Sequence, residues 1–214
     1  AGRRRTADLR RQIESERARI QVLERVRSGY EGYSSGVRQL LVDSPNTALF
    51  EGVLGDLVEV EPGWDGAVEA ALGDAVEALV AQRDEGLLDA LDFLRQSRGG
   101  RAGIFPMDWQ AAAVPEPAVD LSGIAGVAGR LVDRVRVAGA VGPLVQRLLH
   151  NTFAVDDLAA ALDLARHHRG LRVRLVTRAG EGVDVDGCLT GGAESAQDDS
   201  VLGRGREIRQ LRAS

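Results

Sequence analysis

The chain has 214 residues, of which 44% are apolar and 28% are charged, which is ordinary for a globular protein and sufficient for one large domain or two small ones. A single cysteine excludes an internal disulfide and favours a reducing, cytoplasmic setting. No apolar run is long enough for a membrane-spanning helix and no signal-peptide pattern is present, so we expect no membrane partner.

Charge is distributed unevenly along the chain. The net charge is −5, and all 27 basic residues are arginine. Residues 1–30 carry +5 and residues 201–214 carry +3, whereas the body between them, residues 31–200, carries −13. Basic ends on an acidic body indicate a polyanion contact at the ends, and solvated helix faces with ordinary ion pairs are the alternative.

The two ends of the chain have a helical pattern. In residues 1–30, two heptad positions form a partly apolar seam, and the residues on it are Thr6, Leu9, Ile13, Glu16, Ile20, Leu23, Arg27 and Tyr30. Val201, Ile208 and Leu211 keep a similar spacing. We predict that residues 1–30 and 201–214 form the two strands of an antiparallel coiled-coil stub. Separate exposed amphipathic helices remain possible.

The body contains an internal repeat. "ALDFLRQSRGGR" begins at Ala90 and "ALDLARHHRGLR" begins at Ala161, 71 residues later. Each copy is preceded by an amphipathic helix (67–72 and 144–149) and a short apolar strand (77–81 and 152–155), and is followed by a second strand (101–105 and 172–177). Acids that can cap the repeated helix precede it, namely Asp84 in the first copy and Asp156 and Asp157 in the second.

These elements predict a mixed α+β fold with helices packed on sheets. It consists of two pseudo-repeated α/β subdomains, at 31–118 and 119–200. Two prolines between the copies predict a surface loop over 111–126. A further strand is expected at 54–60, and the alternating residues that lead to the glycines at 187–192 predict a hairpin or an edge strand.

The stretch "DVDGCLTGGAE", residues 184–194, combines the only cysteine with three glycines. The acids around the glycines would repel phosphate, and no phosphate-binding loop with a lysine is possible in this chain. Cys188 lacks an evident base, so a half-buried structural thiol is favoured over a nucleophile. His167 and His168 are adjacent on a helix and cannot face one metal, so we predict no catalytic residue and no metal site. The interpretation that is left for the glycines is geometric: without a Cβ they let another backbone approach closely. An ordinary tight turn is the alternative interpretation.

Several motifs together resemble one family. They are "GYSSGVRQLL" at 32–41, "GVLGDLVEVEPGWDGAVEAALG" at 52–73, "GRAGIFPMD" at 100–108, "TFAVDDLAAALDLAR" at 152–166 and "RVRLVTRAGEGVDVDGCLTGG" at 172–192. In this order, over nearly the whole chain, they resemble the hinge domain of bacterial structural maintenance of chromosomes (SMC) proteins.

The resemblance implies a non-enzymatic homodimerisation hinge of a condensin-like protein that acts in chromosome condensation and segregation. Its arms would lead to ATPase heads outside this chain, so that ATP and kleisin-type subunits would bind there, and no cofactor is expected in this chain. It further implies a cytoplasmic, nucleoid-associated location. A hinge of a repair-type SMC relative is the alternative, followed by a ligand-binding or enzymatic domain that uses the glycine-rich turn and Cys188.

The resemblance also implies two sets of site residues. The dimer contact falls on Gly187, Leu189, Thr190, Gly191 and Gly192. Weak DNA binding, with a preference for single strands, falls near the coil junction on Arg3, Arg4, Arg5, Arg204, Arg206, Arg209 and Arg212.

Overall fold

The computed structural model describes residues 33–109, 119–137, 139–167, 170, 172–192 and 201–203. The predicted coiled-coil segment 1–30 therefore lies outside the described residues, as does all of 201–214 beyond its first three residues. Among the helices in the described ranges, none has both the length and the apolar character that a membrane crossing requires.

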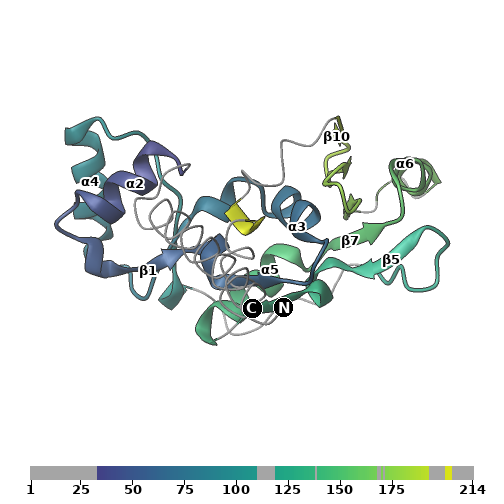
Figure 1. The fold of residues 1–214 in the computed structure, drawn as a ribbon, viewed down its shortest axis with the longest axis horizontal. Helices are drawn as coiled ribbons and strands as arrows, with labels where there is room; N and C mark the ends of the chain where they lie inside the picture. Colours follow the sequence, from purple (N-terminus) through teal and green to yellow (C-terminus); the bar gives the residue numbers. More distant parts are fainter. Residues whose placement is uncertain are drawn as a thin grey trace, which may run out of the picture.

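The described residues fold into two copies of one chain path (Figure 1). Each copy runs from a strand through a 3-10 turn to a second strand, and then through a helix, a strand, a helix and a final strand. The first copy comprises β1 (Phe50–Val53), the turn Leu54–Leu57, β2 (Val58–Val60), α3 (Asp65–Leu72), β3 (Leu79–Ala81), α4 (Leu87–Ser97) and β4 (Ile104–Pro106). The second comprises β5 (Val127–Arg130), the turn Leu131–Arg134, β6 (Val135–Val137), α5 (Gly142–Leu149), β7 (Thr152–Val155), α6 (Leu158–His167) and β8 (Arg174–Val176).

The two copies build equivalent sheets. In the first, β3 lies between β1, which is antiparallel to it, and β4, which is parallel to it. In the second, β7 lies between antiparallel β5 and parallel β8 in the same way. Both outer strands carry a register shift that ends at a glycine with a positive φ, Gly52 in β1 (φ 152°) and Gly129 in β5 (φ 117°). The mixed fold with two repeated α/β units is therefore confirmed.

A short ladder joins the two copies at their centre. β2 and β6 pair antiparallel, with Glu59 opposite Arg136 in the middle of the ladder. Because equivalent strands pair with each other, the two copies are related by an approximate two-fold axis. The sequence repeat extends to this ladder, since "GVLGDLVEV" from Gly52 and "GRLVDRVRV" from Gly129 share five residues at an offset of 77. We did not identify this part of the repeat from the sequence.

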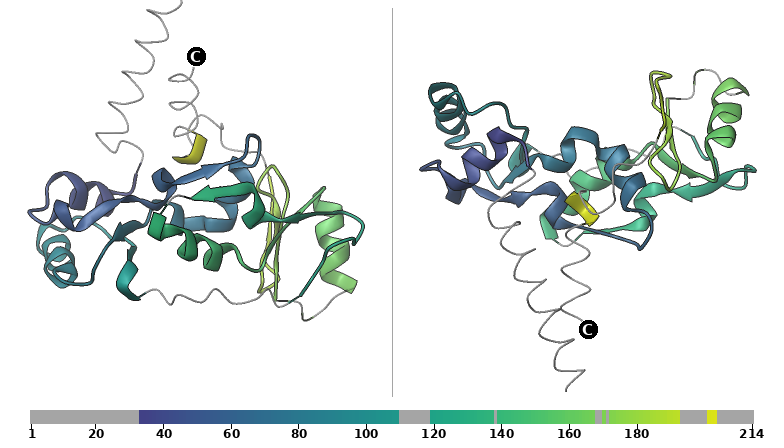
Figure 2. Two further views of the ribbon diagram at one scale, coloured as in Figure 1. Left: turned by 90° about the horizontal axis from the view of Figure 1, so that it is seen from below. Right: turned by 45° about the horizontal axis from the view of Figure 1, so that its top comes forward.

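Each copy also has an element that the other lacks. Helix α2 (Ser35–Val42) precedes the first copy and packs on α4. The strands β9 (Gly182–Val183) and β10 (Leu189–Thr190) follow the second copy and extend its sheet to the order β10-β9-β8-β7-β5. Both additions rise on the same side of the central helices α3 and α5, at opposite ends of the molecule (Figures 1 and 2).

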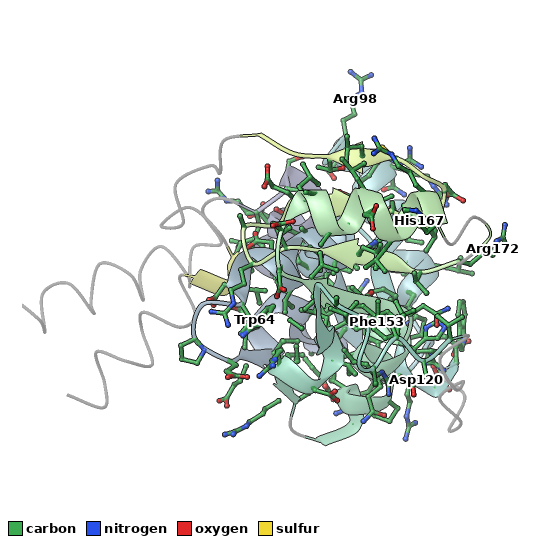
Figure 3. All side chains as sticks on the ribbon, turned by 90° about the vertical axis from the view of Figure 1, so that its right-hand side faces the viewer. Trp64, Arg98, Asp120, Phe153, His167 and Arg172 are labelled. Carbon is green, nitrogen blue, oxygen red and sulfur yellow. The ribbon has the colours of Figure 1, made fainter. Side chains whose placement is uncertain are left out.

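Three apolar clusters support this arrangement. The central one is formed by α3, α5 and the β2–β6 ladder, and it draws residues from both copies. It also holds Val201 and Leu202, which are buried, and Tyr33 packs against it. The other two clusters lie one in each end, around Phe153 in the second copy (Figure 3) and around Leu40 and Leu79 in the first. Both described ends of the chain therefore meet the same central core.

Two sequence predictions are wrong in detail. The strand expected over 54–60 begins only at Val58, because the 3-10 turn Leu54–Leu57 redirects the chain from the first sheet to the central ladder. The segment expected to be a surface loop is partly buried, since Leu121 is 3% exposed and Val119 and Ile124 pack against the second end cluster.

Candidate functional site

The predicted hairpin is present at the far edge of the second sheet. β9 and β10 pair antiparallel, with Leu189 opposite Val183 and Thr190 opposite Gly182. The turn between them is closed by two backbone hydrogen bonds, from Asp184 N to Cys188 O (2.9 Å) and from Gly187 N to Asp184 O (2.8 Å). Gly187 has φ 80°, a left-handed conformation that glycine adopts without steric cost.

Arg174 on β8 anchors the hairpin from below. Its Nε and Nη2 donate to the two carboxylate oxygens of Asp184 at 3.0 and 3.1 Å, and its Nη1 donates to the carbonyl of Ala71 at the end of α3. The hydrogen bonds from Arg174 hold the pKa of Asp184 below its ordinary value, and the amide of Val185, which also donates to this carboxylate, adds to the effect. The fork of one guanidinium thus fixes the hairpin turn to both β8 and α3.

A close backbone approach seats β9 on β8. A Cβ placed on Gly182 would lie 2.0 Å from the carbonyl oxygen of Leu175, so only glycine fits at this point of the ladder. At the other end of the hairpin, the carboxylate of Glu181 accepts a hydrogen bond from the amide of Gly192 at 3.2 Å. β9 is therefore packed tightly against β8, on the edge that faces the rest of the sheet.

The outer side of the hairpin is bare. All five residues predicted for the dimer contact are exposed, and Leu189, an aliphatic side chain, is 52% exposed. A Cβ on Gly187 or Gly192 would meet no atom of the described part of the chain within 4 Å, and one on Gly191 would lie 3.1 Å from the end of the Glu181 side chain. The glycines at 187 and 192 therefore serve backbone conformation, with φ values of 80° and 142°, and leave the edge strand β10 uncovered.

Among the described residues, a second open edge lies on the first copy, and sequence reasoning missed it. β4 is the last strand of the sheet β1-β3-β4, whereas its equivalent β8 is covered by β9. Pro106 at the end of β4 is typical of an edge strand, because proline cannot donate to a ladder. The signal was available in the sequence: "RVRLVT" is followed by the hairpin sequence, while its counterpart "RAGIF" is followed by no similar segment.

Of the residues weighed for chemistry, His168 lies outside the described residues, and the others do not come together. Cys188 is exposed rather than half-buried, because it lies in the hairpin turn instead of the strand that packs on β8. The ring Nδ1 atoms of His150 and His167 contact backbone carbonyls three and four residues earlier, and His167 lies on the outer side of α6 (Figure 3). Within the described ranges, no group of three or more histidine, cysteine or carboxylate side chains is placed to hold a metal ion.

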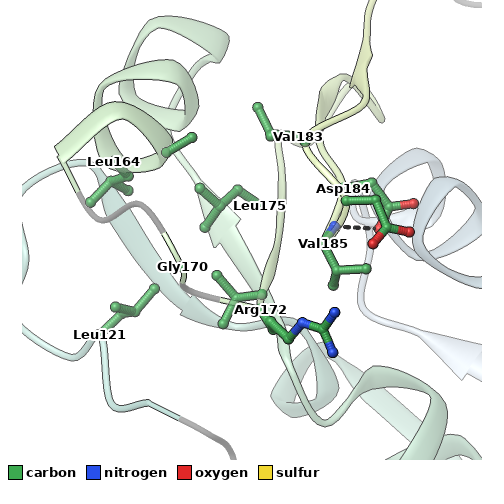
Figure 4. Close-up of a pocket in the computed structure, with 12 residues that line it drawn as sticks. Leu121, Leu164, Gly170, Arg172, Leu175, Val183, Asp184 and Val185 are labelled. Atoms are coloured by element: carbon green, nitrogen blue, oxygen red, sulfur yellow. Dashed lines mark hydrogen bonds between the residues drawn. The ribbon is translucent and has the colours of Figure 1, made fainter.

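A cavity of about 390 Å³ lies between α6 and the hairpin. Leu164, Leu175 and Val183 are among its apolar lining residues, and Arg172 lines it as well (Figure 4). Asp184, which also borders it, is already engaged by Arg174. The seven arginines predicted to contact DNA lie outside the described residues.

The comparison with protein-family models decides the identity of the fold. The model described as the flexible hinge domain of SMC proteins matches residues 46–165. The chain belongs to the SMC hinge family. This confirms the resemblance stated from the motifs.

The curated relatives described next are all named chromosome partition protein Smc. The chromosome partition protein Smc of Desulfitobacterium hafniense is 35% identical over 99% of this chain, and that of Bacillus subtilis is 29% identical over 93%. The match to the Smc protein of Myxococcus xanthus is 31% over 95%. The chain spans only 17–18% of the length of these three relatives.

Solved structures agree with the fold. A crystal structure of an asymmetric dimer of the Geobacillus stearothermophilus SMC hinge domain superposes with a TM-score of 0.82 at 27% identity, covering 97% of this chain and 83% of that one. The hinge domain of Pyrococcus furiosus SMC gives a TM-score of 0.59 at 21% identity over 87% of this chain and 91% of that one, which supports the fold alone.

Proposed function

We propose that this chain is the homodimerisation hinge of a chromosome-organising, condensin-like SMC protein and that it joins two SMC arms for chromosome condensation and segregation. The observation that carries the proposal is the pair of open edges at opposite ends of one protomer, β4 on the first sheet and β10 on the second. The Geobacillus relative was crystallised as a hinge dimer, which supports self-association.

The two edges are complementary between copies. In a two-fold dimer, β10 of one copy adds to β4 of the other, and the symmetry repeats the contact at the other end. Each joint would connect the three-stranded sheet of one copy to the five-stranded sheet of the other. Pairing of both edges satisfies the backbone groups that an edge strand otherwise leaves to water.

Charge favours the same arrangement. Between residues 33 and 109 the first copy has five arginines and fourteen acids, a net charge of −9. Between residues 119 and 192 the second copy has nine arginines and eight acids, a net charge of +1. Contact between unlike ends therefore avoids the repulsion that two acidic ends would suffer.

The route of the chain fits a hinge. Tyr33 and Val201, which border the two basic end segments, both pack on the central cluster. The backbone N–H of Val201 donates to a carboxylate oxygen of Glu69 on α3 at 3.3 Å. Two arms that leave this point together would lead to head domains outside this chain, where ATP and kleisin-type subunits would bind. A protein of this kind would be associated with the nucleoid. Relatives named as chromosome partition proteins favour this context over a repair-type one.

The dimer is tested by placing charge on the edge strand. Leu189→Glu with Thr190→Glu adds two carboxylates to β10 without changing a glycine whose φ is positive. We expect a folded monomer in sedimentation analysis, with a circular dichroism spectrum like that of the parent chain. Val42→Glu is the control, because Val42 is an equally exposed aliphatic side chain (51%) that lies on α2 and in neither β4 nor β10. A double variant that stays dimeric at the parent's affinity overturns the proposal.

We also propose weak binding of DNA, preferentially single-stranded, near the coil junction through the arginines of the two ends. The charges of +5 and +3 on segments that flank a body of −13 support it. Arg204→Glu, Arg206→Glu and Arg209→Glu together should weaken binding of a labelled single strand and reduce its dependence on salt. Charge reversal of the exposed Arg38, Arg83 and Arg95 is the control. Equal effects of the two triple variants would show that binding follows net charge rather than this site.

A further inference from the structure

The two tryptophans of the chain have opposite environments. Trp64 is 2% exposed, and the guanidinium carbons of Arg134 and Arg178 lie 5.0 and 4.5 Å from its ring centroid. Trp109 is 68% exposed. It ends the 3-10 turn Met107–Trp109, which follows directly after the edge strand β4.

The exposed indole is nevertheless held in place. Its Nε1–H donates to the carboxylate of Asp84 at 3.0 Å, and the amide of Asp84 donates to the carboxylate of Asp108 at 3.1 Å. These two bonds tie the turn that follows β3 to the turn that follows β4. An aromatic side chain fixed in this way loses little conformational freedom when a second surface covers it.

Exposed apolar side chains are concentrated at the two ends of the protomer. Within the described ranges, the large exposed ones are Val42, Leu88 and Trp109 on the first copy and Val185 and Leu189 on the second. Trp109 continues the open edge β4, and Leu189 lies on the open edge β10. Each of the two edges assigned to the dimer therefore has a large exposed apolar side chain: Leu189 lies in β10, and Trp109 follows β4.

We propose that Trp109 is an anchor of the dimer contact and that the β9–β10 hairpin of a second copy covers it. This inference rests on the proposed dimer. Tryptophan is enriched among the few residues that supply most of the binding energy of interfaces. Four exposed acids accompany Trp109, and these are Asp84, Glu85, Asp89 and Asp108. Each copy also carries the exposed Arg172, which lines one cavity together with Gly187 and the exposed Asp186 of the hairpin turn and supplies a cation beside that turn (Figure 3).

The first test measures acrylamide quenching of tryptophan fluorescence. The contribution of Trp109 is obtained by subtracting Trp109→Phe, in which only the buried Trp64 emits, from the parent chain. We expect Trp109 to be quenched strongly in the monomeric Leu189→Glu, Thr190→Glu variant and nearly as weakly as Trp64 in the dimer. Equal quenching of Trp109 in a confirmed dimer and in the monomeric variant overturns the inference. Trp109 would then be exposed in the dimer and available to a different partner.

The second test measures affinity. Because Trp109 is mostly exposed, Trp109→Ala is expected to fold normally. It should raise the dimer Kd about 1000-fold, because the two-fold symmetry removes one hot spot of about 30-fold at each of the two joints. Trp109→Phe should retain most of the affinity. A dimer unchanged by Trp109→Ala refutes the anchor while the proposed function stands. A parent chain that is monomeric at all accessible concentrations refutes both.

Discussion

The two copies of the repeat share a scaffold and differ in what covers it. Each has a central strand flanked by one parallel and one antiparallel neighbour. The first copy is covered by a helix, α2, whose Val37 and Leu40 pack against Ala90 and Leu94 of α4. The second is extended by a hairpin, whose Val183 joins its end cluster. One copy therefore keeps an open strand, and the other presents an extra one.

Each cover is seated through one glycine. A Cβ on Gly36 of α2 would lie 2.2 Å from the carbonyl oxygen of Arg101, and one on Gly182 of β9 would lie 2.0 Å from that of Leu175. The internal repeat supplies two similar frames, and the different covers make the two ends of a protomer unlike. Unlike ends are what a two-fold dimer with sheet-to-sheet joints requires.

The largest expected effects come from these two glycines. Gly182→Ala and Gly36→Ala each force a methyl group onto a backbone carbonyl, and we expect each to lower the free energy of unfolding by about 3 kcal/mol. Gly182→Ala should also abolish the dimer, because β10 is displaced with β9. Denaturant titration and sedimentation measure the two effects.

Gly142→Ala is the matched control for both glycines. Gly142 begins α5, has no positive φ, and a Cβ there would meet nothing within 4 Å. It should be neutral or slightly stabilising. If Gly182→Ala were as stable as this control, the close approach of β9 to β8 would be wrong.

Smaller effects should distinguish the acids that precede the two repeated helices. The Oδ1 atom of Asp157 accepts a hydrogen bond from the amide of Ala160 at 2.8 Å and caps α6, so Asp157→Ala should cost about 1 kcal/mol. The predicted cap at Asp84 is wrong, because α4 begins after Gly86 without a side-chain cap and the Asp84 carboxylate binds Trp109 instead. Asp84→Ala should therefore leave thermal stability nearly unchanged. Equal losses in thermal melts of the two variants would contradict this difference.

The smallest expected effect is the pH dependence of the hairpin anchor. The pKa of Asp184 is lowered by Arg174, so this pair contributes stability that is fully present above the ordinary value of 3.8 and is lost as pH falls through the lower, folded value. Because both side chains are about a third exposed, the contribution is at most about 1 kcal/mol. Asp184→Asn should remove this part of the acid sensitivity, as measured by urea midpoints between neutral and acidic pH. A variant with the parent's pH profile would argue against the pair.

Features of the site that depend on neighbouring residues in the sequence could be predicted, and features that depend on distant segments could not. The hairpin was predictable, because alternation and glycine spacing are local patterns, whereas the five residues assigned to the dimer contact came from the family resemblance. The β4 edge was not found, since an edge is defined by the absence of a neighbouring strand, and that is a property of the assembled sheet. The exposure of Cys188 and the true partner of Asp84 depend equally on packing.

By itself, the sequence determined the helix-strand-helix-strand part of each repeated unit, the position of the hairpin and the family, because hydrophobic periodicity, turn residues and motif order are written along the chain. Only the tertiary structure decided that β2 and β6 join the copies about an approximate two-fold axis. It also decided that residues 54–57 turn rather than extend and that β4 and β10 are the open edges. These features arise from contacts between segments tens of residues apart, and local preference cannot select among such contacts.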